Sequence, residues 1–406
     1  MLALPPSLSQ GGYRWLHTAA KLVLLFFGIA LWYRAWSYYA YYLLTLTWIL
    51  DGGLFRLRQT INEPLVKAIL VLCLVVGLGI FWSEDSKLGI KVWRRHFIFL
   101  IFIPYASLLN KERLSSAVIG IALGFSAAVT IGIYEQAVMG VQGIPVLDMS
   151  YLDFSSTIGI GILATLYLAC VSKNRTLKIT LWILTVFLLF VQFQQYARGA
   201  LAATLLSSCI LLFFFYKAQA RALLAIFSSF IIVVAFLAFA SANFQQRIAQ
   251  IKSDIELLEA GNFSTSLGYR IAIWDIGLHG IAERPIFGHG TGMAANYFER
   301  SVETYKGGLY KELQEFEGGI THHYHNDWIE IGMHVGALGI LAYAYLLFSW
   351  FKTLQVHRMR DLGAALACFI FLSGLTDNFI AFRQVVYFLL VVTAIAAVWK
   401  TYNRFE

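Results

Sequence analysis

Long apolar segments alternate with short polar connections along almost the whole chain. A helix needs about 20 mainly apolar residues to cross a hydrocarbon core about 30 Å thick. The pattern therefore predicts an all-α polytopic membrane protein with about twelve transmembrane helices. The predicted spans are residues 17–33, 37–50, 67–82, 96–109, 115–138, 155–172, 177–194, 199–216, 222–241, 328–351, 362–380 and 385–401.

Positive charge gathers in alternate connections between these spans. The residues concerned are Arg56, Arg58 and Lys67; Lys111 and Arg113; Lys173, Arg175 and Lys178; Lys217 and Arg221; Lys352, Arg358 and Arg360; and Lys400 and Arg404. Cytoplasmic connections carry an excess of lysine and arginine, so we expect both termini to be cytoplasmic. The chain then divides into spans 1 to 9 (1–241), a long periplasmic loop (242–327) and spans 10 to 12 (328–406).

One connection disagrees with this topology. The segment between the third and fourth spans carries Lys87, Lys91, Arg94 and Arg95 on the predicted outer side. Either the topology of the first spans is misassigned or the basic cluster has a function there. We favour a function.

The long loop should be partly helical. Ile248, Ile251, Ile255 and Leu258 recur at helical spacing before Gly261, which predicts an amphipathic helix with a glycine stop. A second helix is expected from Tyr269 to about Ala282. The following "RPIFGHGTG" lacks the spacing of a phosphate-binding loop and reads as a structured turn.

Composition supports the membrane interpretation and limits the alternatives. Of the residues, 59% are hydrophobic and 13% charged, against about 25% charged in soluble domains. The net charge of +8 is spread between apolar segments, so no nucleic-acid partner is expected. Four cysteines lie singly in apolar runs, and the N-terminus does not resemble a cleaved signal peptide.

Three residues stand out as candidates for chemistry at the outer face. Arg198 lies between two spans, where it could reach a lipid headgroup or hold an anion. Arg270, in the long loop, could instead pair with Asp275 or a nearby glutamate. His325 ends the loop and could instead cap the next helix.

Together the three residues suggest a single reaction. Guanidinium groups bind phosphates through paired hydrogen bonds and stay charged at all relevant pH values. An imidazole can accept a proton from a hydroxyl near neutral pH. If Arg198, Arg270 and His325 converge, they could bind a lipid diphosphate and activate an acceptor, which indicates group transfer from a lipid carrier.

The motifs "YARGA", "YRIAIWDIGLHGIAERPIFGHGTG" and "HHYHNDWIEIGMHVGALGIL" resemble the core of the O-antigen ligase and O-antigen polymerase superfamily. The resemblance covers about residues 185 to 345. It implies an undecaprenyl-diphosphate-linked glycan donor, a glycosyl acceptor, and neither a cofactor nor a catalytic metal.

By motif match, the resemblance implies that Arg198 and Arg270 hold the donor diphosphate and that His325 activates the acceptor hydroxyl. Asn326 follows His325 as in the family pattern, although "HHYHN" leaves His323 as an alternative base. We see no carboxylate nucleophile for a covalent intermediate, so we expect a single displacement that inverts the anomeric carbon. Zinc binding by the histidines at 322, 323 and 325 is the less favoured alternative.

Among family members, the chain is most similar to an O-antigen ligase, an enzyme of the bacterial inner membrane that transfers O-antigen polysaccharide to lipid A core. The alternatives are an O-antigen polymerase, a ligase that glycosylates proteins, and a lipid or solute transporter. Secondary contacts could come from Asp377 and Arg383, which either form an ion pair or bind acceptor phosphate. Arg94 and Arg95 could contact a phosphorylated acceptor or membrane lipids.

Overall fold

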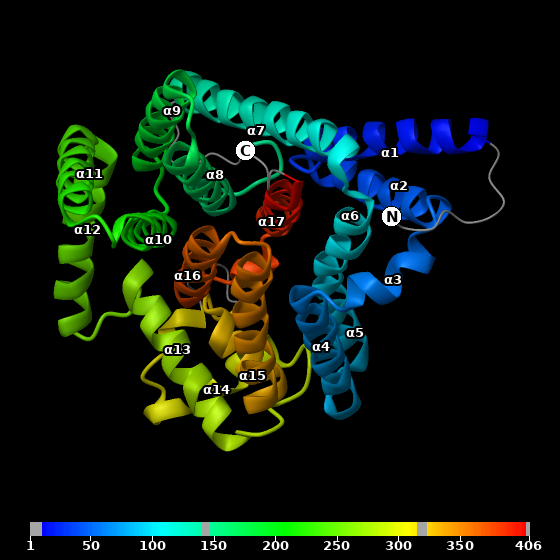
Figure 1. The fold of residues 1–406 in the computed structure, drawn as a ribbon. Helices are drawn as coiled ribbons and strands as arrows, with labels where there is room; N and C mark the ends of the chain where they lie inside the picture. The colour runs from blue at the N-terminus through cyan, green and yellow to red at the C-terminus, as the bar shows by residue number, and fades with distance from the viewer. Residues whose placement is uncertain (1–9, 140–145, 315–322, 403–406) are drawn as a thin grey trace.

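The computed structural model describes residues 10–139, 146–314 and 323–402. Within these ranges the named elements are all helical (Figure 1). The α-helices are α1 (Gln10–Ala30), α2 (Arg34–Leu50), α3 (Gly53–Ile61), α4 (Pro64–Leu78), α5 (Ser86–Arg95), α6 (Phe102–Leu108), α7 (Lys111–Met139), α8 (Tyr151–Val171), α9 (Arg175–Phe193), α10 (Arg198–Tyr216), α11 (Ala220–Ala240), α12 (Ala242–Glu259), α13 (Ser266–Glu283), α14 (Ala294–Ser301), α15 (Asp327–Val356), α16 (Arg360–Thr376) and α17 (Arg383–Tyr402). Short 3-10 helices include η1 (Gly79–Trp82), η2 (His96–Ile101) and η6 (Phe379–Ala381).

In the described part of the chain, seven helices are long and apolar enough to cross a membrane. They span Pro64–Trp82, Lys111–Val138, Tyr151–Val171, Arg175–Phe193, Arg198–Tyr216, Ala220–Ala240 and Asp327–Val356. The protein is therefore an all-helical membrane protein, while the count of twelve spans stays a prediction. The predicted span 96–109 differs most, because η2 and the short α6 share it. Pro104 lies within α6 and removes a backbone donor there.

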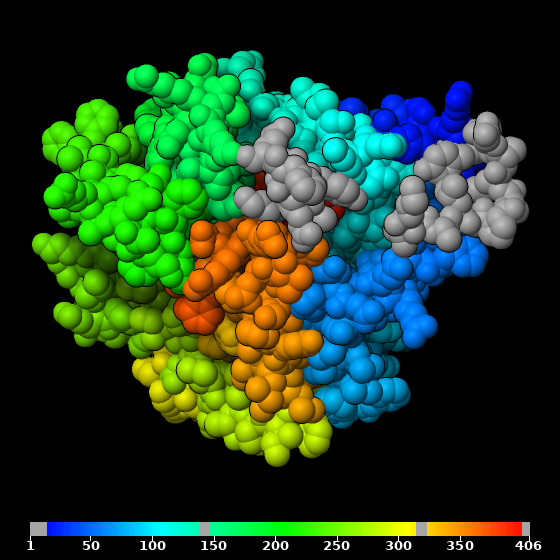
Figure 2. Space-filling view, in the orientation of Figure 1, coloured from blue at the N-terminus to red at the C-terminus, as the bar shows by residue number. Residues whose placement is uncertain are grey.

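The spanning helices share one large hydrophobic core. Helix α15 packs against α4 and α16, and α10 packs against α8 and α16. In the space-filling view, the orange surface of α15 and α16 lies between the green helices α9 to α11 and the blue helices α3 and α4 (Figure 2). Helix α11 is exposed over most of its surface, as expected for a helix that faces lipid.

The predicted loop contains folded structure with its own smaller core. Both predicted helices are present, as α12 and α13, and α12 gives way to Gly261 in a left-handed conformation. Helices α13 and α14 pack beside α15 (Figure 1). Their apolar side chains form a second hydrophobic cluster with Tyr324 and the start of α15. This cluster fixes α13 relative to the first turns of α15.

The glycine-rich segment is a structured turn, as predicted, and it closes a break in α15. The break falls at Val335–Gly336, where the backbone leaves the helical conformation. The carbonyls of Met333 and His334 accept hydrogen bonds from the N–H groups of His289 (2.8 Å) and Gly290 (3.0 Å). Carbonyls freed inside an apolar protein need such partners. The turn therefore ties the loop to the membrane helix below it.

Candidate active site

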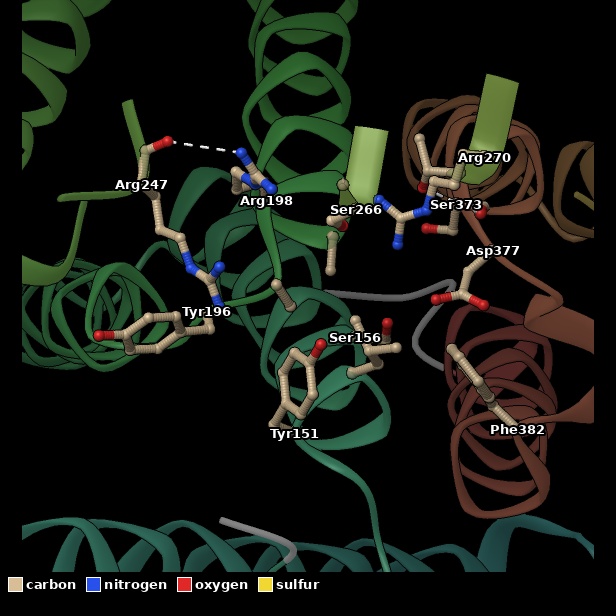
Figure 3. A pocket seen from close by; sticks show the side chains of 15 residues that line it. Tyr151, Ser156, Tyr196, Arg198, Arg247, Ser266, Arg270, Ser373, Asp377 and Phe382 are labelled. Carbon is tan, nitrogen blue, oxygen red and sulfur yellow. Dashed lines mark hydrogen bonds between the residues drawn. The ribbon is translucent and has the colours of Figure 1, made fainter. Parts of the chain in front are cut away.

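A cavity of about 540 Å³, partly open to solvent, lies where α8, α10, α12, α13 and α16 meet (Figure 3). Arg198 and Arg270 point toward the same space, with Ser266 between them and Asp377 at its edge. The two arginines expected to meet therefore line one cavity. They come from segments far apart in the sequence, and packing of α13 on α15 and of α10 on α16 brings them together.

Close packing at Gly199 brings Arg198 near Asp377. A Cβ atom at Gly199 would lie 2.4 Å from Oγ1 of Thr376, the last residue of α16. Only glycine allows α10 to begin this close to the end of α16. The segment "YARGA" thus owes its place at the cavity to a small residue as well as to its arginine.

A third arginine, which the sequence analysis did not single out, also lines the cavity. Arg247 of α12 stacks its guanidinium 3.9 Å from the ring centre of Tyr196, and its carbonyl accepts a hydrogen bond of 3.4 Å from Arg198. The sequence feature that could have pointed to Arg247 is its position close to the end of the predicted span 222–241. A single arginine at the start of an amphipathic helix, however, has the pattern of an ordinary solvated charge.

The positive charge of the cavity has no salt bridge among the described residues. Neither Arg198, Arg247 nor Arg270 forms an ion pair there. In particular, Asp275 binds Lys306 and Tyr310, so the alternative pairing of Arg270 with Asp275 is wrong. Three unpaired guanidinium groups around one cavity make a favourable place for a multiply charged anion.

The start of α10 adds to this potential. Ala197 at the N-cap provides no side-chain hydrogen bond, and Ala197, Arg198, Gly199 and Ala200 all line the cavity. The first N–H groups of a helix have no partner within it, and the helix dipole is positive at this end. Backbone and side chains therefore favour the same kind of ligand, an anion such as a phosphate.

His325 adjoins the cavity through Asp377. Its Nδ1 lies 3.0 Å from Oδ1 of Asp377, which follows the last residue of α16 and lines the cavity. When this nitrogen donates to the carboxylate, Nε2 is left as a proton acceptor. His325 also holds a left-handed backbone conformation (φ 47°), which is uncommon for residues other than glycine.

Burial by itself raises the pKa of Asp377. The hydrogen bond and charge of His325 and the hydrogen bond from the N–H of Asn378 lower this pKa, and together they outweigh burial. The pKa of this carboxyl group therefore lies below its ordinary value, and Asp377 is ionised at neutral pH. Its other oxygen, Oδ2, is buried without a hydrogen bond in the described structure. The carboxylate can thus orient the imidazole and stabilise its protonated form.

Asn326, rather than His325, caps α15. Its Oδ1 accepts hydrogen bonds from the N–H groups of Trp328 (2.9 Å) and Ile329 (3.2 Å). Its Nδ2 donates to the carbonyl of Leu375, near the end of α16. The capping alternative for His325 is therefore wrong, and Asn326 holds the His325 backbone next to the segment that carries Asp377.

His323 lies beside His325, with 4.1 Å between the ring centres. Burial and the neighbouring His325 lower the pKa of His323. One possible ligand atom from each of His323, His325 and Asp377 lies within 4.8 Å of the others, so these three residues are the described group that could hold a metal ion. Histidine and carboxylate ligands suit zinc. His322 lies outside the described residues.

The remaining candidates lie elsewhere. Arg383 does not pair with Asp377, whose partner is His325, and the ion-pair alternative is therefore wrong. Five residues separate them across η6, and Arg383 instead stacks on Tyr38 at 4.2 Å. Arg94, Arg95 and Arg383 line a second cavity.

These features define an all-helical membrane protein with a cavity lined by three arginines beside a histidine–aspartate pair. Residues 183–344 match the family model described as O-antigen ligase, so this part of the chain is similar to that family. The match starts in α9 and ends in α15, so it includes Arg198, Arg270 and His325 but not Asp377.

A protein of Haemophilus influenzae (strain ATCC 51907 / DSM 11121 / KW20 / Rd), described only as an uncharacterized protein, is 32% identical over 118 residues. The matched segment makes up 29% of this chain and 29% of the relative. It therefore says nothing about the activity of the whole protein.

Proposed function

We propose that this protein is an inner-membrane glycosyltransferase that transfers O-antigen polysaccharide from undecaprenyl diphosphate to lipid A core oligosaccharide. The observation that carries the proposal is the meeting of Arg198, Arg247 and Arg270 around one cavity, next to the pair of His325 and Asp377. The family match of residues 183–344 supports this class of reaction.

In the proposed mechanism, the arginines bind the donor diphosphate. His325 removes a proton from the acceptor hydroxyl, and the resulting oxygen nucleophile attacks the anomeric carbon of the donor. The bond from that carbon to the diphosphate oxygen breaks, and its electron pair leaves with the diphosphate. A single displacement of this kind inverts the anomeric centre.

The arginines contribute most where charge develops. Negative charge on the diphosphate grows as the bond breaks, so preorganised guanidinium groups stabilise the transition state more than the bound donor. The proton ends on His325, where the Asp377 carboxylate balances the new positive charge. In this proposal no step needs a metal ion.

We further propose that the cavity faces the periplasm and that both termini are cytoplasmic. In that arrangement Arg198, Arg270 and His325 all lie on the side opposite the positively charged connections. Labelling tests the arrangement. A cysteine introduced at the exposed Glu259 should react with an impermeant maleimide added outside intact inner-membrane vesicles of periplasmic-side-out orientation.

Reconstituted transfer tests the activity. Purified protein receives undecaprenyl-diphosphate-linked glycan and lipid A core in the presence of EDTA. Wild type should glycosylate lipid A core, and His325→Ala and Arg270→Ala should lose the activity. His279→Ala, which changes an exposed histidine on the same helix as Arg270, should retain it.

The product identifies the reaction. Chain growth on undecaprenyl diphosphate would replace the ligase assignment with that of a polymerase, and glycosylated protein would indicate a protein O-oligosaccharyltransferase. Activity that EDTA abolishes and zinc restores would assign a metal to His323, His325 and Asp377. Failure to transfer to any acceptor, by folded protein that binds donor, would refute the proposed function.

A further inference from the structure

A second cavity lies at the other end of the segment from Asp377 to Arg383, where Arg383 lines it. It has a volume of about 1190 Å³, open to solvent, and we call it the basic cavity. Five cationic side chains line it: Arg34, Lys91, Arg94, Arg95 and Arg383. Tyrosines of α2 and α17 also line it, as do Phe97 and Ile98. An adjoining cavity of about 770 Å³ shares Arg34, Arg95 and Arg383 with it.

The five cations are not neutralised within the described structure. None of them forms a salt bridge with a described residue. Two carboxylates, Asp148 and Asp153, line only the adjoining cavity. One oxygen of Asp148 accepts a hydrogen bond from the backbone N–H of Arg34, and one oxygen of Asp153 accepts one from the Ser150 hydroxyl. The basic cavity thus keeps a strong positive potential.

The Arg383 side chain is held in place and has buried donors without partners. Its guanidinium stacks on the ring of Tyr38, 4.2 Å from the ring centre. Its Nε and Nη1 are buried and have no hydrogen-bond partner in the described structure. Buried donors without partners are costly, and a phosphate oxygen beside the guanidinium would supply an acceptor for one of them. This unsatisfied side chain is an observation independent of the charge count.

The basic cavity lies close to the proposed reaction. Asp377 and Phe382 line the first cavity, and Arg383 lines the second, so one short segment containing η6 separates them. Two of the tyrosines that line the basic cavity are exposed, Tyr38 (39%) and Tyr42 (68%). Exposed tyrosines are typical of the membrane–water interface, where lipid headgroups lie.

We propose that the basic cavity binds a phosphate group of the acceptor, and that the acceptor is therefore a phosphorylated glycolipid. This inference rests on the proposed function. A carrier-linked donor has its two phosphates adjacent, and the arginines of the first cavity account for both. A second anion site next to the catalytic pair then belongs to the second substrate. A protein acceptor would not need such a site.

Two acceptors share this chemistry. Lipid A core carries phosphates, and a second undecaprenyl-diphosphate glycan carries a diphosphate. The experiment therefore uses three acceptors in nanodiscs: lipid A core, the same lipid after phosphatase treatment, and undecaprenyl-diphosphate glycan. The variants are Arg383→Gln and the double variant Arg94→Gln/Arg95→Gln, which changes exposed side chains. Arg58→Gln, an exposed arginine lining neither cavity, is the matched control.

We expect Arg383→Gln and the double variant each to raise KM for a phosphorylated acceptor about tenfold, since each removes charge-assisted hydrogen bonds. KM for the donor should stay within about twofold. With the dephosphorylated acceptor, both variants should be as active as the wild type. Whether lipid A core or carrier glycan shows the effect identifies the source of the phosphate.

A binding measurement separates this inference from the proposed function. His325→Ala protein in nanodiscs is mixed with each acceptor, and the bound lipid is counted by native mass spectrometry. Phosphate-dependent binding that Arg383→Gln abolishes would support the basic cavity even if no transfer occurs. Equal losses on phosphorylated and dephosphorylated acceptors, or a raised donor KM, would overturn the inference and leave the transferase proposal standing.

Discussion

Replacing Asp377 with asparagine tests whether the carboxylate acts through His325. The change keeps the size of the side chain but removes its charge, and Oδ1 currently accepts hydrogen bonds from His325 (3.0 Å) and Asn378 (2.9 Å). Hydrogen bonds to charged groups contribute about 1.5–3 kcal/mol. Because 1.36 kcal/mol corresponds to tenfold in rate, we expect kcat to fall about 10- to 150-fold. The donor KM should change little, because the arginines still bind the diphosphate.

The assay is single-turnover transfer by Asp377→Asn, His325→Ala and the double variant, with Glu299→Gln as an exposed carboxylate-to-amide control. If Asp377 acts only by orienting His325, its replacement should cost nothing further once the imidazole is gone. An equal loss in both backgrounds would refute this coupling. So would a change confined to donor KM, which would place Asp377 in donor binding.

Four further predictions concern stability and packing; each is tested by thermal unfolding in detergent, and Gly199→Ala also by the donor KM. Gly199→Ala should lower the unfolding midpoint and raise donor KM, because its Cβ would lie 2.4 Å from Thr376 Oγ1; normal values for both would contradict the close approach. Gly336→Ala should cost at least about 1–3 kcal/mol, since its backbone conformation is accessible essentially only to glycine and its Cβ would lie 2.5 Å from backbone of the glycine-rich turn. Gly261→Ala, with positive φ but no neighbour within 4 Å, should cost less. Because the pKa of His323 is lowered in the folded protein, its contribution to the free energy of unfolding is present above the unfolded-state pKa of about 6.5 and is lost as the pH falls. His323→Gln should therefore flatten the decline of the unfolding midpoint between about pH 7 and pH 5.

Hydrophobic periodicity predicted the helical class and the two helices of the long loop, because both are local signals. The sequence raised the convergence of Arg198 and Arg270 as a hypothesis, since the predicted topology put both at one face, but only the fold could bring them to one cavity. The docking of the glycine-rich turn did not follow. It depends on a break in α15 more than 40 positions away. A glycine inside an apolar run does not indicate which donors will bind the carbonyls that the break frees, here those of Met333 and His334.

The site residues that sequence reasoning missed or misassigned have a common cause. Arg247 and Asp377 have roles set by partners from other helices, and residue type could not reveal those partners. Asp377 and Arg383 are close in sequence and opposite in charge, which favoured an ion pair. With the turn through η6 between them, Asp377 instead contacts His325 and Arg383 contacts Tyr38. Charge proximity along a chain is a weak guide where a short helix reverses direction.

The basic residues that depart from the positive-inside pattern meet in one cavity of the structure. Lys91, Arg94 and Arg95 of α5 lie on the predicted outer side, against the trend of the other connections. They line the basic cavity with Arg34, from the connection after the first span, and Arg383, from the connection before the last. All three connections are predicted to be outer, as is the segment that carries His325. A misassigned topology would scatter these residues over two faces, whereas they line one cavity. That the shared face is the outer one stays a prediction, and in the proposed function the charge gathered there holds an anion.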